Sequence, residues 1–224
     1  GADGTLDKDG NNIAVTAGTY KIIFNTSALT YTIEAYAWGL VGDATTNSWD
    51  GPDMPLAYDS FSNTWKAIVT LVDGKIKFRF NNSWDLNYGD DGVDGTLEGG
   101  GADIVVTAGN YLVTLDLVNL EYKLEPIAIW GLVGDAAPNG WDGPNERFTL
   151  DFEKEGVWVL YGVTLTDGEI KFRTNDSWDY NLGDDGTDGS LEPGGANIPV
   201  TAGTYDIVLD FSDATAPTYT ITAS

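Results

Sequence analysis

The sequence predicts an all-β fold made of tandem, immunoglobulin-like β-sandwich modules. Three observations predict it: short apolar runs with strand alternation, 28 glycines that supply turns, and long segments that occur more than once. The 224 residues include eight Trp, eleven Tyr and eight Phe, which is ample material for apolar cores. No segment carries the apolar periodicity of a helix over a helix-length stretch, so we expect none.

Two long motifs occur twice, in the same order. WGLVGDATTNSWDG begins at Trp38 and recurs as WGLVGDAAPNGWDG from Trp130. DGKIKFRFNNSWDLNYGDDGVDG begins at Asp73 and recurs as DGEIKFRTNDSWDYNLGDDGTDG from Asp167. Repeats of this length indicate whole small domains rather than the units of a solenoid. We therefore expect complete modules at residues 36–125 and 126–224.

The beginning of the chain matches the end of each module. DGTLDKDGNNIAVTAGTYKIIF starts at Asp3, and close copies of it start at Asp94 and Asp188. We expect residues 1–35 to be the C-terminal remnant of a preceding module. Its strands would expose unpaired edges and an apolar face, so we expect them to dock on a neighbouring copy or on the next module. The junctions lack Gly/Ser linkers, which indicates stiff connections.

One repeated strand concentrates the basic residues. Residues 75–81 alternate strictly, with Ile76, Phe78 and Phe80 on one face and Lys75, Lys77, Arg79 and Asn81 on the other. Residues 111–117 and 205–211 also have strand patterns. The chain has only 11 basic residues, yet this strand and its copy hold Lys75, Lys77, Arg79, Lys171 and Arg173. We expect this basic face to be open to solvent. The alternative is that it pairs with nearby Asp.

Composition excludes several classes of function. The chain has no Cys and no His, which removes disulfides, thiol catalysis, zinc fingers and any His-based triad. The net charge of −24 disfavours nucleic acid, anionic lipid and anionic polysaccharide as partners. No phosphate-binding or dinucleotide motif occurs, and carboxylates that recur in every repeat do not suit an active site. We predict a non-enzymatic protein with a neutral partner or a bound cation.

Tryptophans accompany the basic strand. Trp84 and Trp178 follow it directly, while Trp49 and Trp141 lie in polar loops after the first strand of each module. An indole stacks on the C–H face of a pyranose, and Arg, Lys and Asn can satisfy the sugar hydroxyls. This combination predicts a site for a neutral sugar in each module. We expect the other tryptophans to be in the core: Trp38, Trp130, Trp65 and Trp158.

Acidic turns provide the alternative. The segments GDDGVDG and GDDGTDG cluster carboxylates that could ligate Ca²⁺, although their spacing is not that of an EF-hand and Asp and Gly are ordinary turn residues. The candidate ligands are Asp90, Asp91, Asp94, Asp184, Asp185 and Asp188. We expect no cofactor, and calcium is the only one that the sequence leaves open.

The repeated motifs W-G-L-V-G-D-A, D-G-K-I-K-F-R-F-N-N-S-W-D and V-T-A-G-N-Y resemble the carbohydrate-binding domains of the SusE/SusF family over essentially the whole chain. This resemblance implies outer-membrane lipoproteins on the surface of glycan-degrading Gram-negative bacteria. Such proteins bind starch or related glycans beside a SusC/SusD-like import complex and have no catalytic activity. Contact with the membrane would then depend on a lipid anchor that this sequence does not include.

The resemblance also implies site residues. It places aromatic platforms on Trp49 with Trp84 and on Trp141 with Trp178. It places the other ligand contacts on Lys77, Arg79, Asn81, Asn82 and Tyr88 in the first module, and on Lys171, Arg173, Asn175 and Asp176 in the second. The change from Asn82 to Asp176, and from Tyr88 to Leu182, indicates that the two sites differ in affinity.

The sequence therefore predicts non-catalytic binding of a neutral polysaccharide at the cell surface, with starch or another α-glucan favoured, as part of a glycan-uptake system. Another neutral glucan, such as a β-glucan, is the first alternative. A calcium-stabilised structural or adhesive rod and an accessory region of a glycosidase remain as further alternatives.

Overall fold

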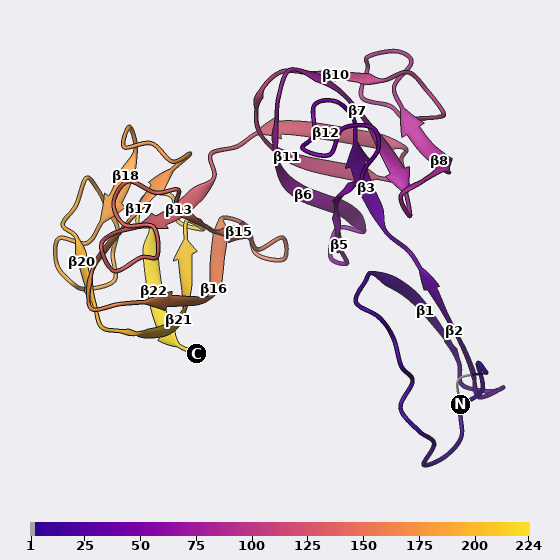
Figure 1. The fold of residues 1–224 in the computed structure, drawn as a ribbon, viewed down its shortest axis with the longest axis horizontal. Coiled ribbons are helices and arrows are strands. Elements are labelled where there is room, and N and C mark those ends of the chain that lie inside the picture. Colours follow the sequence, from indigo (N-terminus) through magenta and orange to yellow (C-terminus); the bar gives the residue numbers. More distant parts are fainter. Residues whose placement is uncertain (1–2) are drawn as a thin grey trace. The chain divides into compact units, whose positions relative to one another are not determined.

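The computed structural model describes residues 3–224 and contains only strands, turns and loops (Figure 1). The first two residues of the expected unit 1–35 lie outside this part. The all-β prediction is confirmed, and within residues 3–224 no helix is present that could cross a membrane. The chain divides into two compact units, Gly1–Glu125 and Pro126–Ser224. Their division falls where the repeats end and begin in the sequence.

The first complete module consists of two antiparallel sheets. One sheet has the order β4-β3-β7-β8-β9, and β10 also pairs with β7. The other has the order β12-β11-β6-β5. The strands of the first sheet are β3 (Trp38–Val41), β4 (Met54–Pro55), β7 (Gly74–Phe80), β8 (Ser83–Gly89), β9 (Glu98–Gly99) and β10 (Ile104–Val106). Those of the second are β5 (Ala57–Asp59), β6 (Thr64–Leu71), β11 (Gly109–Asp116) and β12 (Glu121–Pro126).

The second module repeats this arrangement. Its sheets have the orders β14-β13-β17-β18-β19, with β20 on β17, and β15-β16-β21-β22. The first sheet contains β13 (Trp130–Val133), β14 (Glu146–Arg147), β17 (Gly168–Thr174), β18 (Asn181–Gly183), β19 (Glu192–Pro193) and β20 (Ile198–Val200). The second contains β15 (Thr149–Leu150), β16 (Val157–Leu165), β21 (Gly203–Asp210) and β22 (Thr218–Ala223). The strands expected at 75–81, 111–117 and 205–211 are confirmed as β7, β11 and β21.

The core of each module lies between its two sheets. In the first module Leu40 and Phe78 from one sheet share a buried cluster with Val113 and Leu115 from the other. Alternation along β7 and β11 sends these apolar side chains to the same interior, where their removal from water stabilises the sandwich. The expected core tryptophans are confirmed as buried: Trp38, Trp65, Trp130 and Trp158.

The other face of β7 is open to solvent only at Lys75, contrary to expectation, and is covered at Lys77 and Arg79. Lys77 and Arg79 are buried, as is Arg173 at the corresponding place on β17. The loop between β3 and β4 covers this face: a Cβ added to Gly51 would lie only 2.7 Å from Nη2 of Arg79. Gly51 also has a φ of 78°, so both the conformation and the space require glycine there.

The N-terminal segment forms a hairpin of β1 (Tyr20–Asn25) and β2 (Thr30–Ala35). The hairpin has a backbone hydrogen bond that both modules also have. In the hairpin the N–H of Tyr31 donates to the Gly4 carbonyl. The equivalent bonds join Tyr122 to Gly95 and Tyr219 to Gly189. Its apolar face is exposed, however. Ile22 is 64% accessible, whereas Val113 at the corresponding place in β11 is 0% accessible. Docking of this face on a neighbouring copy or module stays a prediction.

Candidate functional site

A pair of tryptophan rings forms the same bent surface in each module. Trp49 from the β3–β4 loop and Trp84 on β8 have ring centroids 6.1 Å apart and planes inclined by 34°. Trp141 and Trp178 have the same separation and inclination. Trp84 and Trp178 are 48% and 45% accessible, and their partners are half-buried. The structure thus brings together the ring pairs that the resemblance placed together, and each pair leaves aromatic surface open to solvent.

An arginine lies against the more exposed ring of each pair. The guanidinium carbon of Arg79 is 4.7 Å from the centroid of Trp84, and that of Arg173 is 4.6 Å from Trp178. Arg79 and Arg173 are only 3% and 2% accessible. A desolvated guanidinium over an indole is a favourable cation–π contact, so each arginine supports one ring and fixes its plane.

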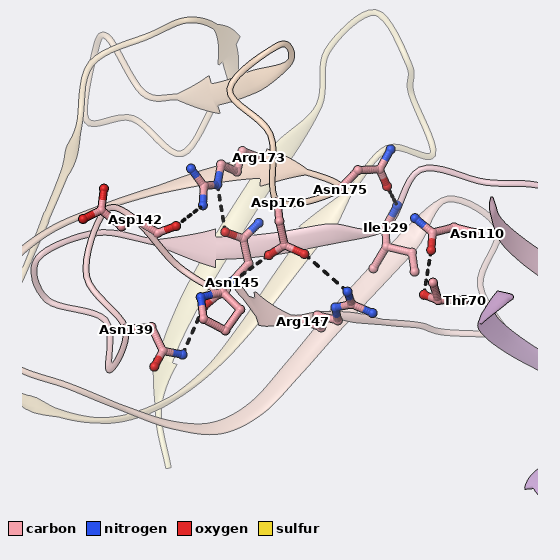
Figure 2. A network of polar contacts seen from close by, with 11 residues as sticks. Thr70, Asn110, Ile129, Asn139, Asp142, Asn145, Arg147, Arg173, Asn175 and Asp176 are labelled. Atoms are coloured by element: carbon pink, nitrogen blue, oxygen red, sulfur yellow. Dashed lines mark hydrogen bonds and ion pairs between the residues drawn. The ribbon is translucent and has the colours of Figure 1, made fainter. Parts of the chain in front are cut away.

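Several donors of each arginine are engaged within the protein. In the first module Nε of Arg79 lies 3.0 Å from both carboxylate oxygens of Asp53. Figure 2 shows the second module, where Nε of Arg173 donates to Oδ1 of Asn145 at 2.8 Å and Nη2 donates to the Asp142 carbonyl at 3.2 Å. Nη1 of Arg173 donates to the Trp141 carbonyl at 3.4 Å. The arginines therefore connect the two halves of each aromatic surface, and their contact with a sugar stays a prediction.

The carboxylate of this network changes position between the modules. Asp53 in the first module corresponds to Asn145, and Asn82 corresponds to Asp176. The side chain of Asn82 accepts the backbone N–H of Asp53 at 2.7 Å, and Asp176 accepts that of Asn145 at the same distance. Asp176 also pairs with Arg147 at 3.3 Å (Figure 2). Each network thus holds one carboxylate at a different place on the same scaffold.

The predicted contacts Asn81 and Asn82 form the turn between β7 and β8. Both have positive φ, 52° and 54°, as the two central residues of a type I′ hairpin turn require. Oδ1 of Asn81 accepts the Ala37 N–H at 2.8 Å, and Nδ2 donates to the Ala35 carbonyl at 2.9 Å. Asn175 and Asp176 have the same left-handed conformation, and Asn175 accepts the Ile129 N–H. These residues hold the chain that leads into the module, which is a structural role.

The remaining predicted ligand contacts, the two lysines and Tyr88, have neighbours within the protein. Nζ of Lys77 is 3.4 Å from the Gly100 carbonyl, and Nζ of Lys171 is 3.4 Å from that of Gly194. The Tyr88 ring packs on the core residue Trp38, with centroids 5.5 Å apart. Tyr88 therefore extends the core rather than the aromatic surface.

Sequence reasoning missed the residues that support the tryptophans. Asp53 and Asn145 anchor the arginines, as described above. The Nδ2 groups of Asn87 and Asn181 donate to the backbone carbonyls of Trp84 and Trp178 at 3.1 and 3.3 Å. A signal was available in the repeated tetrapeptide W-D-G-P at residues 49–52 and 141–144.

The acidic turns are organised by internal hydrogen bonds. Asp90 is buried, and its carboxylate accepts the N–H groups of Gly92 and Gly95 and the hydroxyl of Tyr122. Burial alone would raise the pKa of Asp90, but these hydrogen bonds outweigh it and hold the pKa below its ordinary value. Asp184 has the same environment with Tyr219.

The neighbouring carboxylates are also engaged with the chain. Asp91 and Asp185 accept the N–H groups of Ala102 and Ala196, at 2.7 and 2.8 Å. Asp94 and Asp188 accept local backbone and hydroxyl donors. Within residues 3–224 no three acidic side chains are gathered as a metal site would require. This geometry does not favour calcium ligation by the acidic turns.

Comparison with known proteins finds a family match within the second module. Residues 130–220 match the family described as SusF/SusE starch specific CBMs, where CBM denotes a carbohydrate-binding module. Among solved structures, the chain is similar to the crystal structure of SusF from Bacteroides thetaiotaomicron, with 21% identity and a TM-score of 0.36. The match covers 90% of this chain and 51% of that one, so the chain spans about half its length. No curated protein sequence matches. The resemblance expected from the motifs is confirmed for residues 130–220.

Proposed function

We propose that this chain binds a neutral polysaccharide, an α-glucan of the starch type, through one bent tryptophan surface in each module, without catalysing its breakdown. The observation that carries the proposal is the pair of rings at 6.1 Å and 34°, which occurs identically in both modules. The match of residues 130–220 to starch-specific modules supports the choice of ligand.

The geometry of the rings favours a curved ligand. An α-1,4-linked glucan bends along its length, whereas a β-1,4-linked chain is extended. Two indoles inclined by 34° can each stack on one of two successive pyranose rings of a bent chain. The arginine occupies one face of Trp84 and leaves the other face for the sugar. An extended β-glucan is the second candidate, and it would contact both rings less fully.

The expected strength of one site is modest. A stacked sugar ring contributes on the order of 1–3 kcal/mol, so a single module should bind with a dissociation constant of roughly micromolar to millimolar. The chain carries the same surface twice. Two sites that engage one polymer would raise the apparent affinity through effective concentration.

A non-catalytic role agrees with the use of the carboxylates around these rings. Asp53 is held by Arg79, and Asp176 by Arg147 and the Asn145 N–H, so neither is poised as an acid or a base. By the family resemblance we extend the proposal to the cell surface, beside a SusC/SusD-like import complex in the outer membrane.

Affinity electrophoresis tests the proposal. We expect amylopectin in the gel to retard the protein, and Trp84→Ala combined with Trp178→Ala to remove most of the retardation. Phe61→Ala is the matched control, because Phe61 is an exposed aromatic residue on a turn. A β-glucan gel separates the second candidate. Equal retardation of the double variant and the parent protein in every gel would overturn the proposal.

A further inference from the structure

The first module has a second aromatic hollow, whose lining includes neither Trp49 nor Trp84. A cavity of about 390 Å³ lies where the N-terminal hairpin meets the end of the β5–β6 sheet. The rings of Tyr36, Tyr58 and Trp65 line it, together with the polar side chains of Thr19, Lys21 and Asn63. Sites for small ligands usually have volumes of about 300–1,000 Å³ and a few convergent polar groups.

The three rings form a concave wall. Trp65 is buried, and its ring centroid lies 5.9 Å from that of Tyr36, with planes inclined by 32°, and 5.3 Å from that of Tyr58, with planes inclined by 50°. Tyr58 is half exposed, so part of this wall is open to solvent. Inclined aromatic faces of this kind can hold a pyranose by its C–H surface.

The polar groups at the hollow are donors. The hydroxyl of Tyr58 donates to Oδ1 of Asn63 at 2.6 Å, so the group that Asn63 can offer a ligand is its Nδ2 donor. Nζ of Lys21 lies 5.5 Å from the centroid of Tyr36. This ammonium repels a cationic ligand from the aromatic wall. Amide and ammonium donors beside aromatic faces fit the hydroxyls and C–H face of a neutral sugar.

The hairpin side of the hollow is fixed to the module. The N–H of Tyr36 donates to the Thr19 carbonyl at 3.0 Å, and Asn81 holds the Ala35 carbonyl. The Tyr36 ring also packs edge-on against Phe80, with centroids 5.0 Å apart. These contacts place Thr19 and Lys21 at the end of β6 without any bound ligand, so the hollow is largely preformed.

The second module lacks the hollow's distinctive side chains. Tyr58 pairs with Trp65 across β5 and β6, and Leu150 pairs with Trp158 at the same place. The residue two positions before that tryptophan is Asn63 in the first module and Gly156 in the second. The residue that leads into the first strand changes from Tyr36 to Ala128. Only the buried tryptophan is kept.

We infer that this hollow is a second sugar-binding site, specific to the first module, for a neutral mono- to trisaccharide such as a glycan chain end. The inference rests on the proposed function for the class of ligand, but it depends on different residues. It would let the first module contact one glycan with two separate surfaces.

The test uses the full chain with both exposed platforms removed, Trp84→Ala with Trp178→Ala. NMR titration with maltotriose, and with cellotriose as a second probe, measures the binding that remains. We expect millimolar binding to persist in this background. Adding Tyr58→Leu and Asn63→Gly, the residues of the second module, should weaken it at least tenfold. Asn63 has a φ of 56°, so glycine is well tolerated there.

Two results would overturn the inference: no trisaccharide binding in the background variant, or binding unchanged by the Tyr58 and Asn63 substitutions. If the double substitution lowers the melting temperature, Lys21→Ala on the exposed hairpin replaces it, and the same weakening is expected. Failure of the proposed function is recognised separately. In that case amylopectin would retard the platform variant as strongly as the parent chain, whatever happens at Tyr58.

Discussion

The guanidinium of Arg79 lies against the ring of Trp84, 4.7 Å from its centroid, while its Nε is bound by Asp53. Asp53, Arg79 and Trp84 are thus in contact in that order. Such a desolvated contact contributes about 2 kcal/mol. Through this contact Arg79 fixes the position of the Trp84 ring.

Removing this arginine should weaken both folding and binding. We expect Arg79→Met to lower the free energy of unfolding by about 3–5 kcal/mol, because it leaves Asp53 buried without its partner. Urea denaturation measures this change. Asp53→Asn combined with Asn82→Asp is the matched control, since it reproduces both Asn145 and Asp176 of the second module, and it should cost much less. Adding Asp53→Asn to Arg79→Met should restore stability but not amylopectin binding by the first module. Restored binding would show that Arg79 does not position the ring.

The turn residue Asn81 should be sensitive to substitution. Asn81→Ala removes hydrogen bonds to Ala37 and Ala35 and places a residue with a Cβ but no polar side chain at a φ of 52°. A loss of about 2 kcal/mol in unfolding free energy is expected from these effects together. Asn82→Gly is the comparison, because glycine suits the turn and only one hydrogen bond is lost. Equal losses in the two variants would contradict the role assigned to Asn81.

Acid should destabilise the fold through buried carboxylates. Burial opposes ionisation of Asp59, yet hydrogen bonds from Lys66 and Ser62 lower its pKa to about 2. The pKa values of Asp90 and Asp184 are also lowered. A carboxyl group with a lowered folded-state pKa stabilises fully above its unfolded pKa of about 3.9, and that contribution is lost as pH falls below it. Melting temperatures should therefore be level from about pH 7 to 5 and fall below about pH 4.

A matched variant tests the origin of that fall. Asp59→Asn should lower the melting temperature at neutral pH and reduce its decrease in acid. A decrease as steep as that of the parent protein would show that the acid sensitivity lies elsewhere.

Calcium should have little influence on stability. The oxygens of Asp90 and Asp184 already accept backbone and tyrosine donors. We expect the melting temperature in EDTA to equal that in millimolar Ca²⁺. A rise of several degrees with Ca²⁺ would instead favour a calcium-stabilised rod.

Salt should separate ligands by charge. The chain carries a net charge of −24, so alginate should not bind even at low ionic strength. Binding of amylopectin should change little between about 0.05 and 0.5 M salt, because stacking on Trp84 and Trp178 involves no net charge on the ligand. Isothermal titration at the two salt concentrations measures both. A strong salt dependence for amylopectin would point to Lys77, Lys171 and the two arginines as direct contacts.

Patterns in the sequence predicted the strands and the modules. Strict alternation along residues 75–81 predicted β7, because alternation depends only on neighbouring residues. The modules were predicted because the same motifs occur twice in the sequence. The partnership of Trp49 with Trp84 came from the family resemblance. The position of Arg79 beside these two rings could not be predicted from either signal. Whether Arg79 faces water depends on the loop that contains Gly51, and alternation identifies only which face a side chain is on, not what covers that face.

The turn residues show a different limit. Asn81 and Asn82 resemble sugar ligands because amides bind hydroxyls. The same amides are favoured at the left-handed positions of a two-residue turn, and the adjoining strands could have indicated this. The hollow lined by Tyr58 and Trp65 had no sequence signal at all, since its walls come from separate segments.

The exchange of Asp53 and Asn82 for Asn145 and Asp176 has a consequence for recombination between the repeats. The loop before β4 and the turn after β7 have changed together, so a chimera that joins one module's loop to the other's turn inherits an altered charge balance. One such hybrid carries two carboxylates around the arginine, and the reciprocal hybrid carries none. Shuffling of these modules should therefore succeed at whole-module boundaries and be penalised within them.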